Sequence, residues 1–250
     1  MSDWHFGGPT APFFDSEGHE PAGFVFEQIS DDSFALVEGI RYDDANAVVE
    51  VPGRTTITDL ASIPLFMAWF VPVNGRHTPA AVVHDKLVRD SRTDSPDRAV
   101  RRAASDRRSE ADDLFLEAMA ATGVPILRRR IMHAAVVMAT RWQRGGIARI
   151  AMALWVLASL SGTVALVWSA LSGAWVVTAL SALAPLAGAL LWGVRLYPAG
   201  VVAGYVALLI ALPALATTAG YAVYWLAEQA VRVLAPGTKT AETPPPAGYR

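Results

Sequence analysis

The sequence has no cysteine among its 250 residues, which excludes disulfide bonds, thiolate metal sites and a cysteine nucleophile. Charge is missing from most of its C-terminal part, because residues 150–227 contain a single charged residue, Arg195. No soluble core requires 78 nearly uncharged positions in one run. Apolar runs of about 18 residues or more are typical of membrane spans. These absences exclude a single soluble globule.

An excess of positive charge is also lacking. Residues 1–149 carry 17 Lys and Arg against 21 Asp and Glu, a net charge of -4. Neither half of the chain is strongly basic, so we expect no nucleic acid partner. The first residues contain no basic stretch followed by an apolar run, and we do not expect a signal peptide there.

The composition predicts four regions along the chain. Residues 1–23 are rich in Gly, Pro and acidic residues and are predicted to form an irregular arm. Residues 24–146 are predicted to form a soluble α+β domain, and residues 147–230 a region of three transmembrane helices. Residues 231–250, which include three consecutive prolines, are predicted to be disordered.

A small antiparallel sheet is predicted at the start of the α+β domain. Residues 24–29, 34–37 and 47–51 are strand-like runs. The polar runs Ser30-Asp31-Asp32 and Tyr42-Asp43-Asp44 are expected to be the turns that separate them.

Helical patterns follow the predicted sheet. Thr78-Pro79 and Ser95-Pro96 each combine a capping residue with a proline, as at the start of a helix. A further helix is predicted over residues 126–144. It carries five arginines around an apolar body, a composition that suits a helix lying at a membrane surface.

Three spans are predicted, over about 148–170, 174–194 and 199–219, each long enough for a hydrocarbon core of ~30 Å. The third run stays apolar to Ala227, so it either tilts or continues along the membrane interface. Six arginines lie within residues 128–149, and the positive-inside rule therefore places the N-terminal domain in the cytoplasm. After three spans the tail would lie outside.

Two further features of the apolar region predict how it sits in a lipid bilayer. Aromatic residues near the span ends are expected to be interfacial anchors: Trp155, Trp168, Trp175, Trp192, Tyr197 and Trp225. Small residues within the spans are expected to allow a homo-oligomer of closely packed helices: Gly162, Gly188, Gly200 and Gly204.

The residues that could carry chemistry are Asp59, in a loop, and His84, Asp85 and Asp112, on two predicted helices. Adjacent helical residues point about 100° apart, so His84 and Asp85 face different neighbours. If the two helices pack antiparallel, Asp112 accepts a hydrogen bond from His84 and leaves the other ring nitrogen as a base toward water. Asp85 and Asp59, with a nearby backbone carbonyl, are oxygen ligands that suit calcium. A bound calcium polarises a carbonyl, so these parts predict ester hydrolysis by activated water.

Several separated motifs resemble a small uncharacterised domain family of bacteria and their phages, over about residues 48–146. This resemblance implies a bacterial protein, and with the predicted spans a multi-pass protein of the inner membrane, but it implies no activity. The motifs stand in the family's order: Val51-Pro52, Thr58-Asp59-Leu60-Ala61-Ser62-Ile63-Pro64, Ala80-Ala81-Val82-Val83-His84-Asp85, Ala111-Asp112-Asp113-Leu114-Phe115, Ala118-Met119 and Gly123-Val124.

A second resemblance is to the pattern of the prokaryotic secreted phospholipases A-two. It implies that His84 is the base and Asp112 its orienting partner, and that the substrate is a phospholipid. It implies calcium ligands in Asp59, the Leu60 carbonyl and Asp85. The sequence departs from that pattern at Val88, where the family has an aromatic residue.

Alternative interpretations stay open for the same residues. The run from Asp59 to Pro64 also fits a turn in which Asp59 and Ser62 bond local amides. His84 also fits a histidine that is bonded to Asp112 for structure alone. The functional hypotheses are therefore a membrane-anchored, phospholipase-like lipid esterase with calcium and, as the alternative, a non-enzymatic membrane-tethered structural or assembly module of phage type.

Overall fold

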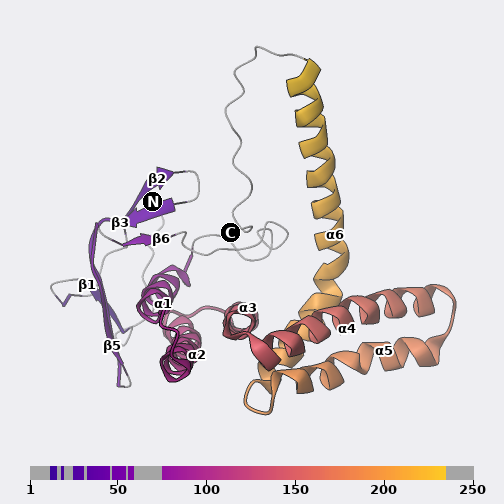
Figure 1. The fold of residues 1–250 in the computed structure, drawn as a ribbon, viewed down its shortest axis with the longest axis horizontal. Coiled ribbons are helices and arrows are strands. Elements are labelled where there is room, and N and C mark those ends of the chain that lie inside the picture. Colours follow the sequence, from indigo (N-terminus) through magenta and orange to yellow (C-terminus); the bar gives the residue numbers. More distant parts are fainter. Residues whose placement is uncertain are drawn as a thin grey trace.

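The computed structural model describes residues 12–15, 18–19, 25–30, 33–45, 47–54, 56–58 and 75–234. Figure 1 shows small sheets at one side, three helices beside them and a long helical region that extends away from both. A small antiparallel sheet at the N-terminal side followed by helices is the arrangement that the sequence predicts, and it is confirmed. The sheet is in fact divided into two.

Each of the two sheets has three antiparallel strands. The first has the order β1-β4-β5, with strands Phe13–Asp15, Ile40–Asp43 and Val48–Val51. The second has the order β2-β3-β6, with strands Phe26–Ser30, Ser33–Leu36 and Ile57–Thr58.

Three of these strands, β1, β4 and β6, were not predicted from the sequence. β1 lies in the predicted irregular arm, where Phe13 pairs with Tyr42 and their rings meet edge to face at 5.1 Å. β4 includes two residues of the predicted turn at 42–44. Its side chains alternate, so that Ile40 and Tyr42 are buried while Arg41 and Asp43 form an ion pair outside the core. The rest of the predicted arm and tail, except residues 18–19 and the helix that ends at Leu234, lies outside the described residues.

Three helices pack beside the sheets. They are α1 (Thr78–Asp90), α2 (Arg98–Ala121) and α3 (Ile126–Arg144). α1 begins at the predicted Thr78-Pro79. α2 begins two residues beyond Ser95-Pro96, because the carboxylate of Asp97 accepts a hydrogen bond from the backbone N–H of Ala99 and caps the helix there.

The main hydrophobic core lies between β1-β4-β5, α1 and α2. The four apolar residues 80–83 of α1 are all buried, together with Tyr42 of β4 and Phe115 and Met119 of α2. Burial of each large apolar side chain stabilises the fold by about 1.5–3 kcal/mol. His84 follows this buried run directly, and it is therefore held at the edge of the core.

The C-terminal helices form a hairpin and one long helix. The hairpin consists of α4 (Gly146–Leu171) and α5 (Trp175–Gly188), which the short helix η2 (Ala189–Trp192) continues. The chain turns between them at Gly173, whose φ of 72° lies in the left-handed region that favours glycine. The long helix is α6 (Tyr197–Leu234).

Two segments, Gly146–Leu171 and Trp175–Trp192, are long and apolar enough to cross a membrane. Within the part of the chain that the structure describes, α6 contributes only a shorter apolar segment, Tyr197–Ile210. Of the three predicted spans, only two therefore meet this criterion among the described residues. Figure 1 shows that α6 crosses the hairpin near its base instead of running beside α4 and α5.

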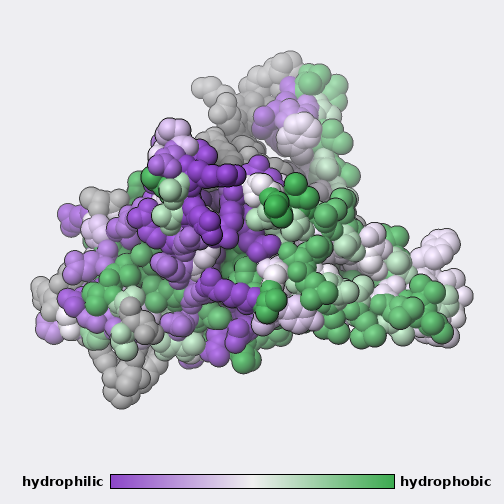
Figure 2. All heavy atoms as spheres, turned by 60° about the horizontal axis from the view of Figure 1, so that its bottom comes forward, coloured by the Kyte–Doolittle hydropathy of each residue, from purple (hydrophilic) through white to green (hydrophobic). Residues whose placement is uncertain are grey.

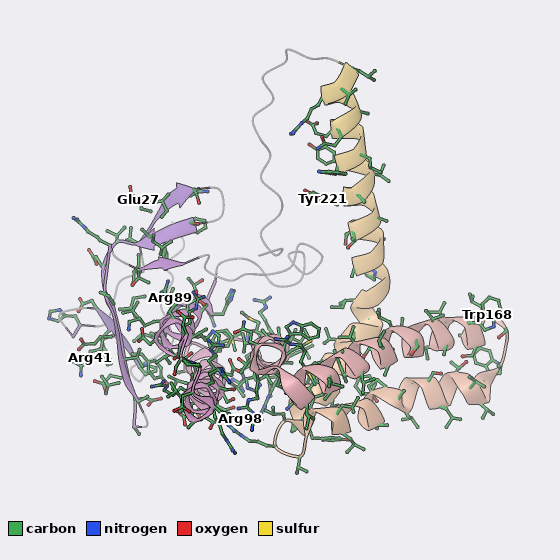
Figure 3. The ribbon with its side chains drawn as sticks, viewed as in Figure 1. Glu27, Arg41, Arg89, Arg98, Trp168 and Tyr221 are labelled. Atoms are coloured by element: carbon green, nitrogen blue, oxygen red, sulfur yellow. The ribbon has the colours of Figure 1, made fainter. Side chains whose placement is uncertain are left out.

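A second core joins the hairpin to α3 and α6. Trp155 and Trp192 meet edge to face at 5.3 Å and are 5% and 1% exposed, so these two residues are buried and are not interfacial anchors. Trp168 and Trp175, by contrast, are exposed, and Figure 3 shows Trp168 at the far end of the hairpin.

Two glycines of α6 allow close helix packing within the chain. A Cβ atom on Gly200 would lie 2.7 Å from Cγ of Trp192, and one on Gly204 would lie 2.8 Å from Cβ of Pro185. Both glycines thus permit α6 to approach the hairpin of the same chain closely. At Gly162 a Cβ would meet nothing within 4 Å, so this position does not serve packing within the chain.

Candidate functional site

The helices α1 and α2 bring His84 and Asp112 together. Nε2 of His84 lies 2.8 Å from Oδ1 of Asp112. The Asp112 side chain is 2% exposed and the His84 side chain 12% exposed. The predicted hydrogen bond between the two side chains is therefore present. Phe115, three residues after Asp112 on α2, places its ring 5.0 Å from the imidazole.

This geometry determines which imidazole nitrogen can exchange a proton. A carboxylate only accepts hydrogen bonds, so Nε2 carries the hydrogen and Nδ1 carries the lone pair. The buried carboxylate also stabilises an imidazolium that forms when Nδ1 takes up a proton. The packing of Phe115 against the ring limits its rotation. The pair therefore has the arrangement of an oriented general base.

The predicted calcium ligands are not assembled among the described residues. Asp59 and Leu60 lie outside the described residues, and Asp85 of α1 is the one predicted ligand within them. Among the described residues, no group of three or more His, Asp or Glu side chains is placed to hold a metal ion. The calcium site stays a prediction.

A second cluster of titratable groups, which the sequence analysis did not predict, surrounds Asp113. Its carboxylate forms an ion pair with Arg195, and its Oδ1 lies 3.7 Å from Nε2 of His133 on α3. Burial lowers the pKa of His133, against the opposing effect of Asp113 and Asp112. One signal was available in the sequence: Arg195 is the single charge in a 78-residue apolar run and requires a polar partner.

A pocket of about 280 Å³ lies between α2, α3 and the segment that joins η2 to α6. Its lining includes Asp112, the same residue that holds His84. Arg141 reaches across the pocket region from α3 and donates to the backbone carbonyls of Leu191 and Trp192, at 3.0 Å each. Burial and the neighbouring Arg144 lower the pKa of Arg141.

Comparison with known protein families finds a match for the part of the chain that contains His84 and Asp112. Residues 34–136 match the sequence model of a family described as a protein of unknown function, DUF1353. This segment is similar to that uncharacterised family. No curated protein and no solved structure matches the chain.

The family segment runs from β3 into α3, so it contains His84, Asp112, Asp113 and His133. The hairpin, α6 and Arg195 lie beyond it. The pocket therefore combines residues of the DUF1353 segment with residues that belong to the C-terminal region of this chain.

Proposed function

We propose that this protein is a membrane-anchored hydrolase that cleaves a lipid ester with water activated by His84. The observation that carries the proposal is the 2.8 Å hydrogen bond between His84 and the buried carboxylate of Asp112. In this reaction Nδ1 of His84 takes a proton from water while the water oxygen attacks the ester carbonyl carbon. The tetrahedral intermediate collapses, its bond to the alkoxide breaks, and the imidazolium returns the proton to the alkoxide. The products are a fatty acid and an alcohol.

The hairpin supports a membrane location for this reaction. Only 17% of the apolar window in each of its two segments is buried, whereas the core helix of a soluble protein is mostly buried. Figure 2 shows the same division, with hydrophilic surface over the N-terminal part and hydrophobic surface over the hairpin. A tether of this kind holds the His84 site beside the bilayer and raises the effective concentration of a phospholipid substrate.

The charges near the hairpin support an orientation. Arg141, Arg144, Arg149 and Arg195 lie near the base, and the turn at 172–174 carries no charge. By the positive-inside rule, the base and the soluble domain lie in the cytoplasm of a bacterial cell and the tip crosses its inner membrane. Two spans return α6 to the cytoplasmic side, where it continues along the interface.

Cysteine labelling tests this orientation, because the natural chain has no thiol. Ser172→Cys at the hairpin tip and Asp94→Cys before α2 are both exposed. An impermeant maleimide applied to intact spheroplasts is expected to label Ser172→Cys and to label Asp94→Cys only after lysis. The opposite pattern would reverse the orientation, and labelling of neither or both in intact cells would refute the span assignment.

The activity is tested with the full chain reconstituted in phospholipid vesicles. Wild type is expected to release fatty acid, and His84→Ala is expected to abolish the release. The matched control is His133→Gln, since His133 is a buried histidine that also lies beside an aspartate but outside the pair. Equal release by wild type and His84→Ala, or equal loss in both histidine variants, would refute the role of His84.

In this proposal Asp59, the Leu60 carbonyl and Asp85 are ligands of a calcium ion, and no step above depends on it. Metal analysis of the purified protein compares wild type with Asp85→Asn and Asp59→Asn. Calcium bound by wild type and lost in both variants is the expected result. Unchanged calcium content in the variants would remove these residues as ligands.

One observation favours the alternative of a structural or assembly module of phage type that associates with copies of itself. The pair is largely buried and connects α1 to α2, as a purely structural interaction does. In that case His84→Ala lowers the melting temperature or the oligomeric state, and wild type releases no fatty acid. Size measurement and calorimetry on the same samples distinguish the two functions.

A further inference from the structure

The pocket beside Asp112 has walls of opposite charge. Its acidic groups all come from α2, and its basic groups come from α3 and the segment after η2. The acids are Asp106, Asp112 and Asp113, and the bases are Arg141, Arg144 and Arg195. The formal charges of the two walls cancel, so the lining suits a ligand that carries both signs better than a simple anion.

Two of the three cations of the pocket form exposed ion pairs, and Arg144 also donates to the hydroxyl of Ser105 at 2.6 Å. Arg195 with Asp113, and Arg144 with Asp106, are exposed ion pairs, with side chains between 41% and 67% exposed. Exposed pairs of this kind contribute little stability and exchange readily for a ligand. Arg141 is different, because the structure bonds it to two backbone carbonyls and leaves its buried Nε without a hydrogen-bond partner among the described residues. Arg141 therefore keeps its two carbonyl bonds and contributes its positive charge to the pocket wall.

The place of the pocket indicates the source of such a ligand. Its floor includes the apolar side chains Val137, Trp192 and Leu196, and its residues 192–196 form the base of the hairpin. Figure 2 shows hydrophilic and hydrophobic surface meeting near the middle of the molecule. A group bound at such a boundary has a polar end among charged side chains and an apolar continuation along the hairpin.

The size of the pocket limits the ligand. A volume of about 280 Å³ is at the lower end for small-molecule sites. It accommodates a phosphate with a short aminoalkyl group and part of a glycerol, but no acyl chains. The acyl chains would remain beside the exposed apolar surface of α4 and α5.

We propose that this pocket binds the headgroup of a zwitterionic phospholipid with a primary ammonium group, such as phosphatidylethanolamine. The phosphate lies toward Arg141, Arg144 and Arg195, and the ammonium lies toward Asp106 and Asp113. This proposal extends the proposed function by naming the headgroup class of the lipid. Only the hydrolysis of the bound lipid rests on the proposed function. Binding itself does not require His84 to act as a base.

Binding is measured with the full chain in detergent, by native mass spectrometry with phosphatidylethanolamine or phosphatidylglycerol. Calorimetry with glycerophosphoethanolamine or inorganic phosphate separates a lipid headgroup from free phosphate. Wild type is expected to retain phosphatidylethanolamine preferentially, and to bind glycerophosphoethanolamine about tenfold or more tightly than phosphate, since the ammonium adds charge-assisted hydrogen bonds.

Two single variants test the basic wall and the acidic wall of the pocket separately. Arg144→Gln is expected to lower the affinity for both lipids about tenfold, because it removes a phosphate contact. Asp113→Asn is expected to lower the affinity for phosphatidylethanolamine about tenfold. The variant is expected to bind phosphatidylglycerol at least as tightly as wild type does, because the lining becomes net positive. Arg101→Gln, an exposed arginine of α2 outside the pocket, is the matched control and is expected to change neither.

Three results would overturn the proposal: equal retention of the two lipids by wild type, phosphate bound as tightly as glycerophosphoethanolamine, or the same loss in Arg101→Gln as in Arg144→Gln. If Asp113→Asn does not fold, Arg195→Gln with Asp113→Asn removes both charges of one exposed pair and is expected to weaken phosphatidylethanolamine. The failures of the two proposals can be told apart with wild type. If wild type binds phosphatidylethanolamine preferentially but hydrolyses no lipid, the esterase proposal is refuted and the headgroup proposal stands. If wild type hydrolyses lipid without headgroup preference, the headgroup proposal is refuted and the esterase proposal stands.

Discussion

Asp112 and Asp113 are neighbours on α2, but their carboxylates contact different parts of the chain. Asp112 accepts a hydrogen bond from His84 on α1, and Asp113 forms an ion pair with Arg195 at the base of the hairpin. Successive residues of a helix point about 100° apart, which separates the two carboxylates. A single turn of α2 thus connects the His84–Asp112 pair with the pocket at the base of the hairpin.

Asp112→Asn is expected to slow fatty acid release by about 10²-fold or more. Its amide can accept from Nε2 but no longer stabilises the imidazolium. It is also expected to lower the free energy of unfolding by about 1–3 kcal/mol, because a buried charge-assisted hydrogen bond is weakened. Initial rates and calorimetry measure the two effects. Asp94→Asn, an exposed aspartate before α2, is the control and should change neither.

Gly200→Ala is expected to destabilise the packing of α6 on the hairpin by about 1–3 kcal/mol, since the new methyl group would overlap the Trp192 ring. Gly162→Ala has open space around it and is expected to be neutral or to stabilise α4 by up to about 1 kcal/mol. Thermal unfolding in detergent compares the two variants. Equal destabilisation by both would contradict the close approach of α6 to Trp192.

Leu157→Lys places a charge at an exposed position near the middle of α4 and is expected to reduce membrane insertion by about 2.5–3.5 kcal/mol. Leu171→Lys, at the hairpin tip, is the matched control, because a lysine near a span end reaches the interface. The carbonate-resistant membrane fraction measures insertion. Equal insertion of both variants would show that α4 does not cross the hydrocarbon core.

Stability is expected to fall as the pH is lowered below about 6.5, the ordinary pKa of histidine. Burial lowers the pKa of His133, so the unfolded chain takes up this proton at a higher pH than the folded chain does. The stability that depends on neutral His133 is complete when the pH is above the pKa of this histidine in the unfolded chain. It is lost as the pH falls through the lower pKa of His133 in the folded chain. Unfolding between pH 8 and pH 5 is compared for wild type and His133→Gln. The same slope in both would exclude His133 as its source.

Much of the local structure was predictable from the sequence because it depends on neighbouring residues. The starting region of α1 follows from Thr78-Pro79, and the hairpin follows from two long apolar runs separated by Gly173. The contact between His84 and Asp112 was predictable as well, because a polar residue that ends a buried helical run requires a buried partner. β1, β4 and β6 were missed, because short strands depend on their cross-strand partners more than on their own composition.

The chain alone determined where its apolar part lies, since 78 nearly uncharged residues in one run contain two helices that are long and apolar enough to cross a membrane. Only the tertiary structure decided how that part is used. Gly200 and Gly204 direct α6 across the hairpin, Trp155 and Trp192 become core residues, and Arg195 meets Asp113 over a separation of 82 residues. The physical reason is that hydropathy depends on each residue alone, whereas close packing and ion pairing depend on which distant side chains the fold brings together.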